Sequence, residues 1–358
     1  MHTRRERRTL HALAAMAPRA ITHRYTDPLD LVWLAAAERL GMRIERSAGV
    51  YASWDGNSKL ELASPETLDA DDSLAQLVFH EICHAIVAGP DGRARPDWGL
   101  DNTSDRDLVF EHACHRLQAT LAGRYGLRDF FAVTTDWRPY WDALPGDPLA
   151  LSDDPALPIA RRALARADQP PYADVLAEAL RRSADIADVV RALSPADSLF
   201  RHTRARHPSG FLEREEPGAN CGDCAWSFAA GIHAFRCRQA TRAGRPNVRV
   251  ASQTPACERY EARLDAESCA GCGACCRQGF DRVDVAPRDA IRKRHPALVH
   301  EDAWGSHLPR PNGHCVALDL AENGYRCRVY ADRPRSCREF AVAGDACLEA
   351  RRRVGLSR

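Results

Sequence analysis

The chain contains very little lysine and carries no strong net charge. Of its 358 residues only Lys59 and Lys293 are lysines, so arginine supplies nearly all of the positive charge. The formal net charge is +1 and neither half is strongly basic, which argues against binding to nucleic acid through a positive field. No run of about 18 apolar residues occurs, so we expect no membrane-spanning helix.

We also expect no export signal at the start of the sequence. The arginine-rich stretch 1–20 has no continuous apolar segment of signal-peptide length, and we expect it to be a flexible tail. A protein without such a signal is expected in the cytoplasm, where reducing conditions disfavour disulfides.

Cysteine is scarce in the first part of the chain and abundant in the rest. Of fourteen cysteines only Cys83 and Cys114 precede Cys221, and the other twelve lie between Cys221 and Cys347. Close-spaced cysteines in a reducing compartment more often bind metal than form disulfides. We therefore expect thiolate metal centres in the C-terminal third. Cys83 and Cys114 are expected to be small buried side chains outside these centres.

The spacing of apolar residues predicts a mixed α+β fold. Residues 28–40 are typical of an amphipathic helix, and short β-like runs follow in MRIER, GVYASW and KLELA. Two further helices are expected at about residues 73–88, ended by Gly89-Pro90, and at about residues 107–124. The sequence therefore predicts a helix pair over a small sheet.

The expected domains follow from these elements and from the cysteines. A metal-dependent domain is expected at residues 21–193. Residues 194–219 are rich in proline, glycine and charge and have no clear period, so we expect a linker there. A four-cysteine module at 220–264 and a cysteine-cluster domain at 265–358 are expected to be loop-rich and stabilised by metal.

The segment FHEICHAIVAG places an HExxH motif on the helix expected at 73–88. His80 and His84 are four residues apart, so both imidazoles can lie on one face and reach one metal ion. Glu81 stands beside them, where its carboxylate can act as a base on a metal-bound water. His80 and His84 are therefore candidate metal ligands, and Glu81 is the candidate catalytic residue.

Two imidazoles leave the coordination of a metal ion incomplete, and the next helix offers further ligands in FEHACHRLQA. Glu111 and His115 are again four residues apart on one face. Glu111 is our choice as the third ligand, followed by His115 and then by Cys114 and His112. Two histidines and one carboxylate suit zinc with an open position or non-haem iron(II).

Residues 45–125 resemble the elongation factor P hydroxylase family. The resemblance rests on His80, Glu81, His84, Ala88-Gly89, Asp97-Trp98-Gly99, Phe110-Glu111 and Gln118-Ala119. It implies a non-haem iron hydroxylase, and members of that family act on a modified lysine of a translation factor. The family has a further acidic residue where this chain has Cys114, and the cysteine-rich part has no counterpart in it. An oxygenase with a different substrate is the implication that we retain.

A first cysteine module has the spacing Cys-x2-Cys-x12-Cys-x19-Cys. Its members are Cys221, Cys224, Cys237 and Cys257. Four such thiolates can surround one tetrahedral zinc ion or one [4Fe–4S] cluster, because a two-residue gap lets a turn aim two sulfurs at one centre. Trp226 and Tyr260 beside the ligands resemble the surroundings of the cluster in high-potential iron–sulfur proteins. A zinc ribbon is the alternative.

A second module opens with CAGCGACC and contains eight cysteines. They are Cys269, Cys272, Cys275, Cys276, Cys315, Cys327, Cys337 and Cys347. Residues 267–350 are similar to the YkgJ-type cysteine-cluster family in CxxCxxCC, in RCRVYADRPRSCREF and in the trailing cysteine, which implies chelation of zinc or iron. Eight thiols are enough for two four-thiolate centres or for one cluster with extra cysteines. The adjacent Cys275 and Cys276 can serve two centres or one polynuclear cluster.

These features lead to three functional hypotheses. The preferred one is a non-haem iron hydroxylase that acts on a protein or peptide, with iron–sulfur centres in the cysteine modules delivering electrons from a donor. The second is a zinc peptidase, in which Glu81 is the base and KLELA pairs with an extended substrate. The third is a metal-chelating protein without enzymatic activity. None of the three involves nucleic acid or a membrane.

Overall fold

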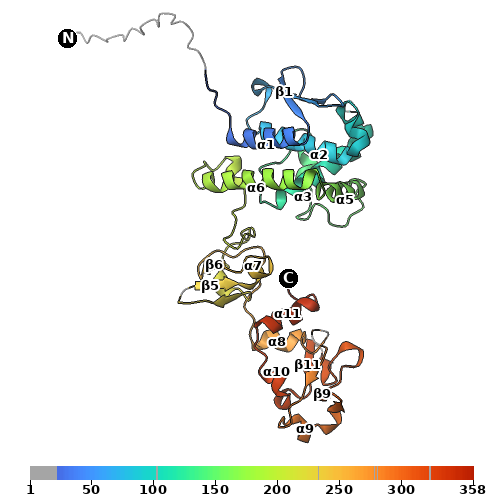
Figure 1. Ribbon diagram of the computed structural model, residues 1–358, viewed down its shortest axis with the longest axis vertical. Coiled ribbons are helices and arrows are strands. Elements are labelled where there is room, and N and C mark those ends of the chain that lie inside the picture. Colours follow the sequence, from blue (N-terminus) through green and yellow to red (C-terminus); the bar gives the residue numbers. More distant parts are fainter. Residues whose placement is uncertain (1–21, 102–103, 233, 278, 280, 322–323) are drawn as a thin grey trace, which may run out of the picture. The chain divides into compact units, whose positions relative to one another are not determined.

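The computed structural model describes residues 22–101, 104–232, 234–277, 279, 281–321 and 324–358. The chain divides into two compact units, Met1–Arg201 and His202–Arg358 (Figure 1). Both contain helices and small sheets, so the predicted α+β class is confirmed. The tail predicted at 1–20 lies outside the described residues. Within them, no helix combines the length and the apolar character needed to cross a membrane.

The N-terminal unit opens with a helix and a three-stranded sheet. The elements are α1 (Pro28–Arg39), β1 (Arg43–Ser47), β2 (Ala52–Trp54) and β3 (Lys59–Ala63). The strand order is β1-β3-β2, with β3 parallel to β1 and antiparallel to β2. KLELA is β3, and its two edges are already occupied by neighbouring strands. The prediction that KLELA pairs with an extended substrate is therefore wrong.

The helix α2 (Leu74–Arg93) forms the centre of this unit. Ser73 caps it by accepting a hydrogen bond from the N–H of Gln76, and fourteen of its twenty residues are buried. The predicted end at Gly89-Pro90 is a kink instead. Gly89 has a φ of 71°, which breaks the helix, and one more turn follows to Arg93. The Arg93 carbonyl accepts a hydrogen bond from Trp54 Nε1 at 2.7 Å, which ties this last turn to β2.

The remaining helices of the unit pack around α2. They are α3 (Leu108–Gly123), α4 (Arg138–Asp142), α5 (Ala156–Ala167) and α6 (Tyr172–Val190). The helices α1, α3 and α5 contact α2, and α6 lies along α1 (Figure 1). The rings of Trp33, Phe79 and Phe131 meet in the core with centroids 4.6–5.5 Å apart. This packing holds α2 and α3 side by side.

The C-terminal unit begins with the first cysteine module. It contains β4 (Ser227–Ala229), β5 (Ala234–Cys237), α7 (Arg238–Arg242) and β6 (Arg249–Ala251), and the three strands form an antiparallel sheet in the order β4-β5-β6. Residues 203–219, expected in the linker, pack onto this module. Arg206 bridges to Leu212 and Glu213 bridges to Cys257.

The second cysteine module follows in the same unit. Its elements are α8 (Ala266–Cys272), β7 (Val283–Asp284), α9 (Ile291–Arg294), β8 (His300–Asp302), β9 (Gly305–Leu308), β10 (Leu318–Ala321), β11 (Gly324–Cys327), α10 (Arg335–Arg338) and α11 (Asp345–Arg353). The strands pair as β7-β9-β8 and β10-β11. All of these elements are short, so loops carry much of the module.

Candidate functional site

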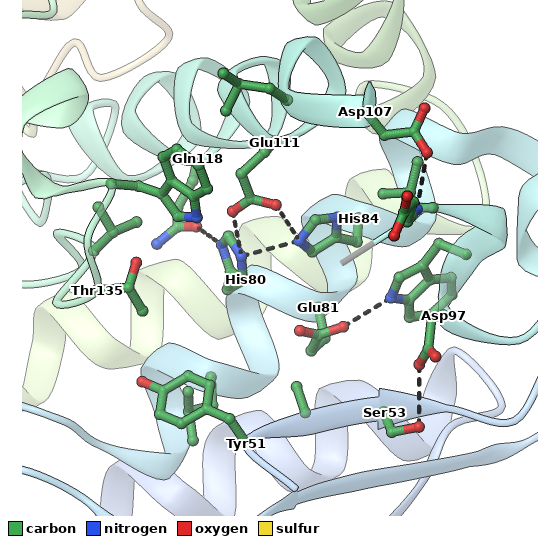
Figure 2. Close-up of a pocket in the computed structure, with 18 of the residues that line it drawn as sticks. Tyr51, Ser53, His80, Glu81, His84, Asp97, Asp107, Glu111, Gln118 and Thr135 are labelled. Atoms are coloured by element: carbon green, nitrogen blue, oxygen red, sulfur yellow. Dashed lines mark hydrogen bonds and ion pairs between the residues drawn. The ribbon is translucent and has the colours of Figure 1, made fainter. Parts of the chain in front are cut away.

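Three side chains of the N-terminal unit converge, His80 and His84 from α2 and Glu111 from α3 (Figure 2). The Nε2 atoms of the histidines are 3.0 Å apart, and the Glu111 carboxylate lies 3.3 Å from His80 Nε2 and 3.1 Å from His84 Nε2. Ligands bound about 2.1 Å from one ion are roughly 3.0–3.4 Å apart. Among the described residues, no other group of three or more His, Cys, Asp and Glu residues brings its ligand atoms within 4.8 Å of one another.

The Glu111 carboxylate and the His80 ring form a charged pair. Burial lowers the pKa of His80, but the Glu111 carboxylate outweighs this effect and raises the pKa to about 9. Burial also raises the pKa of Glu111, yet His84, His115 and His80 together hold that pKa well below its usual range. Glu111 is therefore ionised and ready to bind a cation, which would take the place of the proton on His80.

Gln118 on α3 fixes the ring of His80. Its Nε2 donates to the Phe131 carbonyl at 2.7 Å, so its Oε1 is left to accept from His80 Nδ1 at 2.8 Å. Because Nδ1 keeps its proton through this bond, a cation that displaces the other proton would find the lone pair of His80 Nε2 facing Glu111 and His84. Gln118 belongs to the residues that resemble the hydroxylase family, and a role in the site was not predicted for it. Its position seven residues after Glu111, on the same face of a helix, was the signal for a role in the site.

His115 is the second-choice ligand, and the structure places it behind Glu111. Its ring is 1% exposed, and its Nε2 lies 3.0 Å from Glu111 Oε1. Burial lowers the pKa of His115 to about 4, so the ring is neutral and lies against the carboxylate without adding charge. Cys114 Sγ lies 3.3 Å from His84 Nδ1, and His112 stacks on Tyr140 at 3.6 Å. These residues surround the three converging side chains and are not part of that group.

Replacing Gln118 by leucine is expected to weaken metal binding at this site by about 10- to 100-fold, the usual effect of losing the partner of a metal-bound histidine. Isothermal titration of the metal-depleted protein measures the effect. Gln76→Leu is the matched control. Gln76 is also buried and donates to a carbonyl, that of Ala132, but its Oε1 has no hydrogen-bond partner among the described residues. Equal losses in both variants would show that Gln118 acts through packing alone.

The three converging residues face a cavity of about 290 Å³. Glu81 lines its wall toward β2, and Glu81 Oε2 accepts a hydrogen bond from Trp98 Nε1 at 2.7 Å (Figure 2). Asp97, Asp101 and Asp107 also line the cavity, and no lysine or arginine does so among the described residues. The wall is therefore acidic, and it favours a ligand that carries positive charge.

The four cysteines of the first module line one small cavity in the C-terminal unit. Each is 6–7% exposed, and burial raises the pKa of Cys221 to about 12. The N–H groups of Trp226 and Arg259 hydrogen-bond the sulfurs of Cys224 and Cys257. Such bonds stabilise thiolates, whereas burial away from a cation destabilises them. This combination suits four sulfurs held by a metal ion or cluster.

The structure adds His207 to this cavity, a residue that the sequence analysis missed. The ring is buried, and its Nδ1 accepts a hydrogen bond from the N–H of Ser209 at 3.0 Å. The proton of the neutral ring is therefore on Nε2, which lies 3.2 Å from Cys221 Sγ. His207 is placed to donate a hydrogen bond to a thiolate. It stands in the predicted linker, fourteen residues before Cys221, and nothing in its spacing marked it.

The eight cysteines of the second module are free thiols, as are the other six of the chain. The loop of CAGCGACC is closed by Gly273, which has a φ of 55° after α8. A Cβ atom on Gly273 would lie 2.5 Å from the Cβ of Tyr325 in β11. Glycine is therefore required for the close approach of this loop to β11. Cys83 and Cys114 are fully buried in the N-terminal unit, whereas the other twelve cysteines belong to the C-terminal unit.

Comparison with known proteins agrees with the chemistry of the second module. Residues 268–353 match the CxxCxxCC family, described as "Putative zinc- or iron-chelating domain". The uncharacterized protein YkgJ of Escherichia coli O157:H7 is 33% identical over 103 residues, which are 25% of this chain and 93% of that protein. The chain belongs to this family. Residues 268–353 therefore bind a metal ion, zinc or iron.

The family match confirms the predicted resemblance of the second module. It begins at residue 268 and does not reach the N-terminal unit. No solved structure matches the chain. The resemblance of residues 45–125 to the elongation factor P hydroxylases stays a prediction.

Proposed function

We propose that the chain is a non-haem iron oxygenase that hydroxylates a protein or peptide. The convergence of His80, His84 and Glu111 on the cavity of about 290 Å³ carries the proposal. Two histidines and one carboxylate on one face leave open positions, the ligand set of iron(II) oxygenases. When bound there, iron(II) would supply the activation of O2.

The protein's own residues orient and enclose this site. Gln118 keeps the lone pair of His80 Nε2 directed at the centre, and the buried ring of His115 lies against the Glu111 carboxylate. Glu81 and Asp97 make the cavity wall acidic, so a substrate side chain with an amino or guanidinium group is the class that it suits. Peptides and proteins supply such groups as lysine and arginine.

The cysteine modules would provide the electrons. Hydroxylation of a C–H bond by O2 places one oxygen atom in the product and reduces the other to water, which requires two electrons and two protons. Among the described residues, the side chains that line the cavity are no net source of two electrons, so the electrons must come from elsewhere. Iron–sulfur centres at the cysteines would accept them singly from an external donor. Zinc at the same cysteines would leave the oxygenase dependent on a separate reductase.

A zinc peptidase is the second candidate, because Glu81 lines the same cavity as the metal-binding histidines. In that enzyme Glu81 would be the general base and its loss would lower the rate by about 10²- to 10⁴-fold. Against it stands the central position of β3, which leaves KLELA without a free edge for a substrate strand.

The variant Glu81→Gln separates the two candidates. In the oxygenase, Glu81 is not a ligand, so we expect the variant to bind iron(II) and nitric oxide, an O2 surrogate, as the wild type does. The electron paramagnetic resonance signal of the iron–nitric oxide adduct in anaerobic protein is the measurement. Iron and acid-labile sulfide analysis of the same preparation tests the cysteine centres. Peptide hydrolysis by the zinc-loaded wild type that disappears in Glu81→Gln would replace the oxygenase with the peptidase.

A further inference from the structure

A cavity of about 30 Å³ gathers four of the eight cysteines of the second module. Cys269 and Cys272 line it from α8, Cys275 from the loop after α8, and Cys347 from α11. Much of the remaining wall is apolar and includes Leu264, Phe340 and Val342. None of the other cysteines that the structure describes lines this cavity.

The other four cysteines gather on a separate apolar cluster. Cys315 is buried in it with residues of β7 and β9, and Cys276, Cys327 and Cys337 pack against it. The N–H of Cys315 donates to the Cys276 carbonyl at 2.7 Å, which ties the CxxCxxCC loop to this group. The sulfurs of Cys315 and Cys327 each accept a hydrogen bond from the N–H two residues further on, the arrangement already seen at Cys224 and Cys257.

The two groups of four cysteines adjoin at two residues that are consecutive in the sequence. Cys275 faces the cavity, whereas Cys276 packs on the apolar cluster. Their sulfurs are 3.9 Å apart. Cys275 and Cys276 thus join the two groups of four, which explains why the motif ends in two adjacent cysteines.

We propose that the second module holds two separate four-thiolate metal centres. Centre A consists of Cys269, Cys272, Cys275 and Cys347, and centre B consists of Cys276, Cys315, Cys327 and Cys337. Four thiolates complete a tetrahedral zinc site or one [4Fe–4S] cluster, so neither centre needs a ligand from the other. The proposal rests on metal chelation by the family and is independent of the oxygenase activity.

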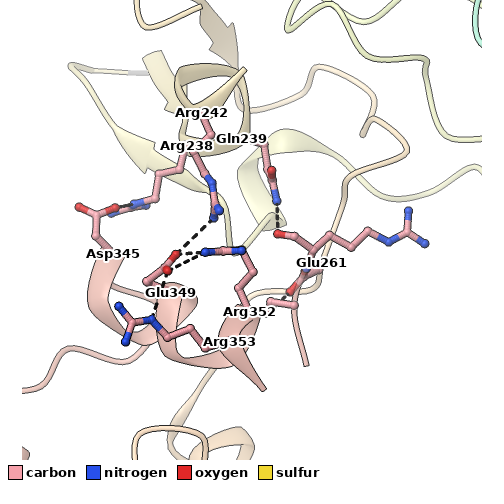
Figure 3. Close-up of polar contacts among 10 residues, drawn as sticks. Arg238, Gln239, Arg242, Glu261, Asp345, Glu349, Arg352 and Arg353 are labelled. Atoms are coloured by element: carbon pink, nitrogen blue, oxygen red, sulfur yellow. Dashed lines mark hydrogen bonds and ion pairs between the residues drawn. The ribbon is translucent and has the colours of Figure 1, made fainter. Parts of the chain in front are cut away.

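Centre A takes its last ligand from a helix that is fastened to the first cysteine module (Figure 3). In α11, Asp345 pairs with Arg238, and Glu349 lies 3.7 Å from Arg242. Leu348, next to Cys347, is 1% exposed and packs in an apolar cluster with Trp226 and Cys224.

The residues after α11 are held in the same way. Ser357 Oγ and the N–H of Arg358 donate to the Glu261 carboxylate at 2.6 and 2.8 Å, and Gln239 Nε2 donates to the Arg358 carbonyl at 2.8 Å. Centre A is therefore positioned by the first module. Centre B draws all of its ligands from residues 276–337 and lacks this dependence.

Zinc counting on the full chain distinguishes two centres from one polynuclear cluster. Three double variants are compared: Cys269→Ser/Cys347→Ser within centre A, Cys315→Ser/Cys337→Ser within centre B, and Cys337→Ser/Cys347→Ser across both. Each protein is reduced, loaded with zinc, treated with a competing chelator and analysed by native mass spectrometry. We expect the first two variants to lose one zinc ion each and the third to lose two.

Equal losses in all three variants would overturn the division, because a single cluster is damaged by any pair of substitutions. Substitution of cobalt for zinc tests whether the loss of zinc results from misfolding of the variant. The surviving centre of each within-centre variant should show the sulfur-to-cobalt charge-transfer bands and visible spectrum of a tetrahedral four-thiolate site. A spectrum with fewer sulfur ligands would also contradict the assignment.

A further pair of variants tests whether the contacts of α11 with the first cysteine module position the ligand of centre A. Leu348→Ala is expected to weaken zinc binding about tenfold at centre A and to leave centre B unchanged. Val329→Ala, in the apolar cluster beneath centre B, is the matched control. It should weaken zinc binding at centre B and leave centre A unchanged. Each affinity is measured in the double variant that retains only the centre in question. If both substitutions weakened both centres equally, the inference that each centre is positioned by its own surroundings would be wrong.

Discussion

Replacing His80 or His84 by alanine is expected to remove the metal ion from the N-terminal site and to leave the cysteine-bound metals in place. Each substitution deletes one of three converging ligands, so the loss of affinity should exceed the roughly 10- to 100-fold effect of an outer-shell change. The iron–nitric oxide signal should disappear, while the iron or zinc content of the cysteine modules stays at the wild-type level. Metal analysis and spectroscopy of one preparation measure both.

His112→Ala is the matched control for these variants. His112 lies next to Glu111 in the sequence, but its ring stacks on Tyr140 at 3.6 Å and is not one of the converging groups. The variant should keep its N-terminal metal. A wild-type signal that survives in both His80→Ala and His84→Ala would show that the iron is bound elsewhere.

Removal of all metals is expected to unfold residues 202–358 and to leave the N-terminal unit folded. The buried apolar clusters among the cysteines are small, one of seven residues and one of four, whereas a single large cluster fills most of the N-terminal unit. Structural zinc sites contribute on the order of 10 kcal/mol to the folding of small domains. Without metal, the cysteine modules retain little to offset their chain entropy.

Limited proteolysis after treatment with a chelator under reducing conditions measures this difference. Cleavage should concentrate after His202, and a protected fragment that contains α1 to α6 should accumulate. Restoring zinc before the protease is added is the control, and it should protect both units. A C-terminal unit that resists cleavage when it is demonstrably metal-free would contradict the prediction, as would cleavage spread evenly along the chain.

The parts of the site that the sequence could predict are those governed by local periodicity. The spacing of His80 and His84 predicts a shared helical face, and the next periodic segment supplies Glu111. The structure brings these three side chains together. Local spacing also identifies the cysteine motifs, because ligands that share one turn must stand two or three residues apart.

The parts that escaped prediction depend on contacts between distant segments. Gln118 acquires its role only because Phe131 occupies its amide group and leaves its oxygen for His80. His207 is in a stretch without periodicity, and the fold alone brings it to Cys221. The position of KLELA between two strands depends on strand order, which no property of the segment itself encodes.

The burial of α2 has a consequence for how the two kinds of metal are held. The helix that carries His80 and His84 is already locked in position by the packing of fourteen of its twenty residues. An ion bound at this site could therefore dissociate and bind again without unfolding the helix that carries its ligands. By contrast, ions that stabilise the cysteine modules, as predicted above, could be exchanged only if the surrounding chain opened. The proposed sites would thus differ in how readily their metal ions exchange.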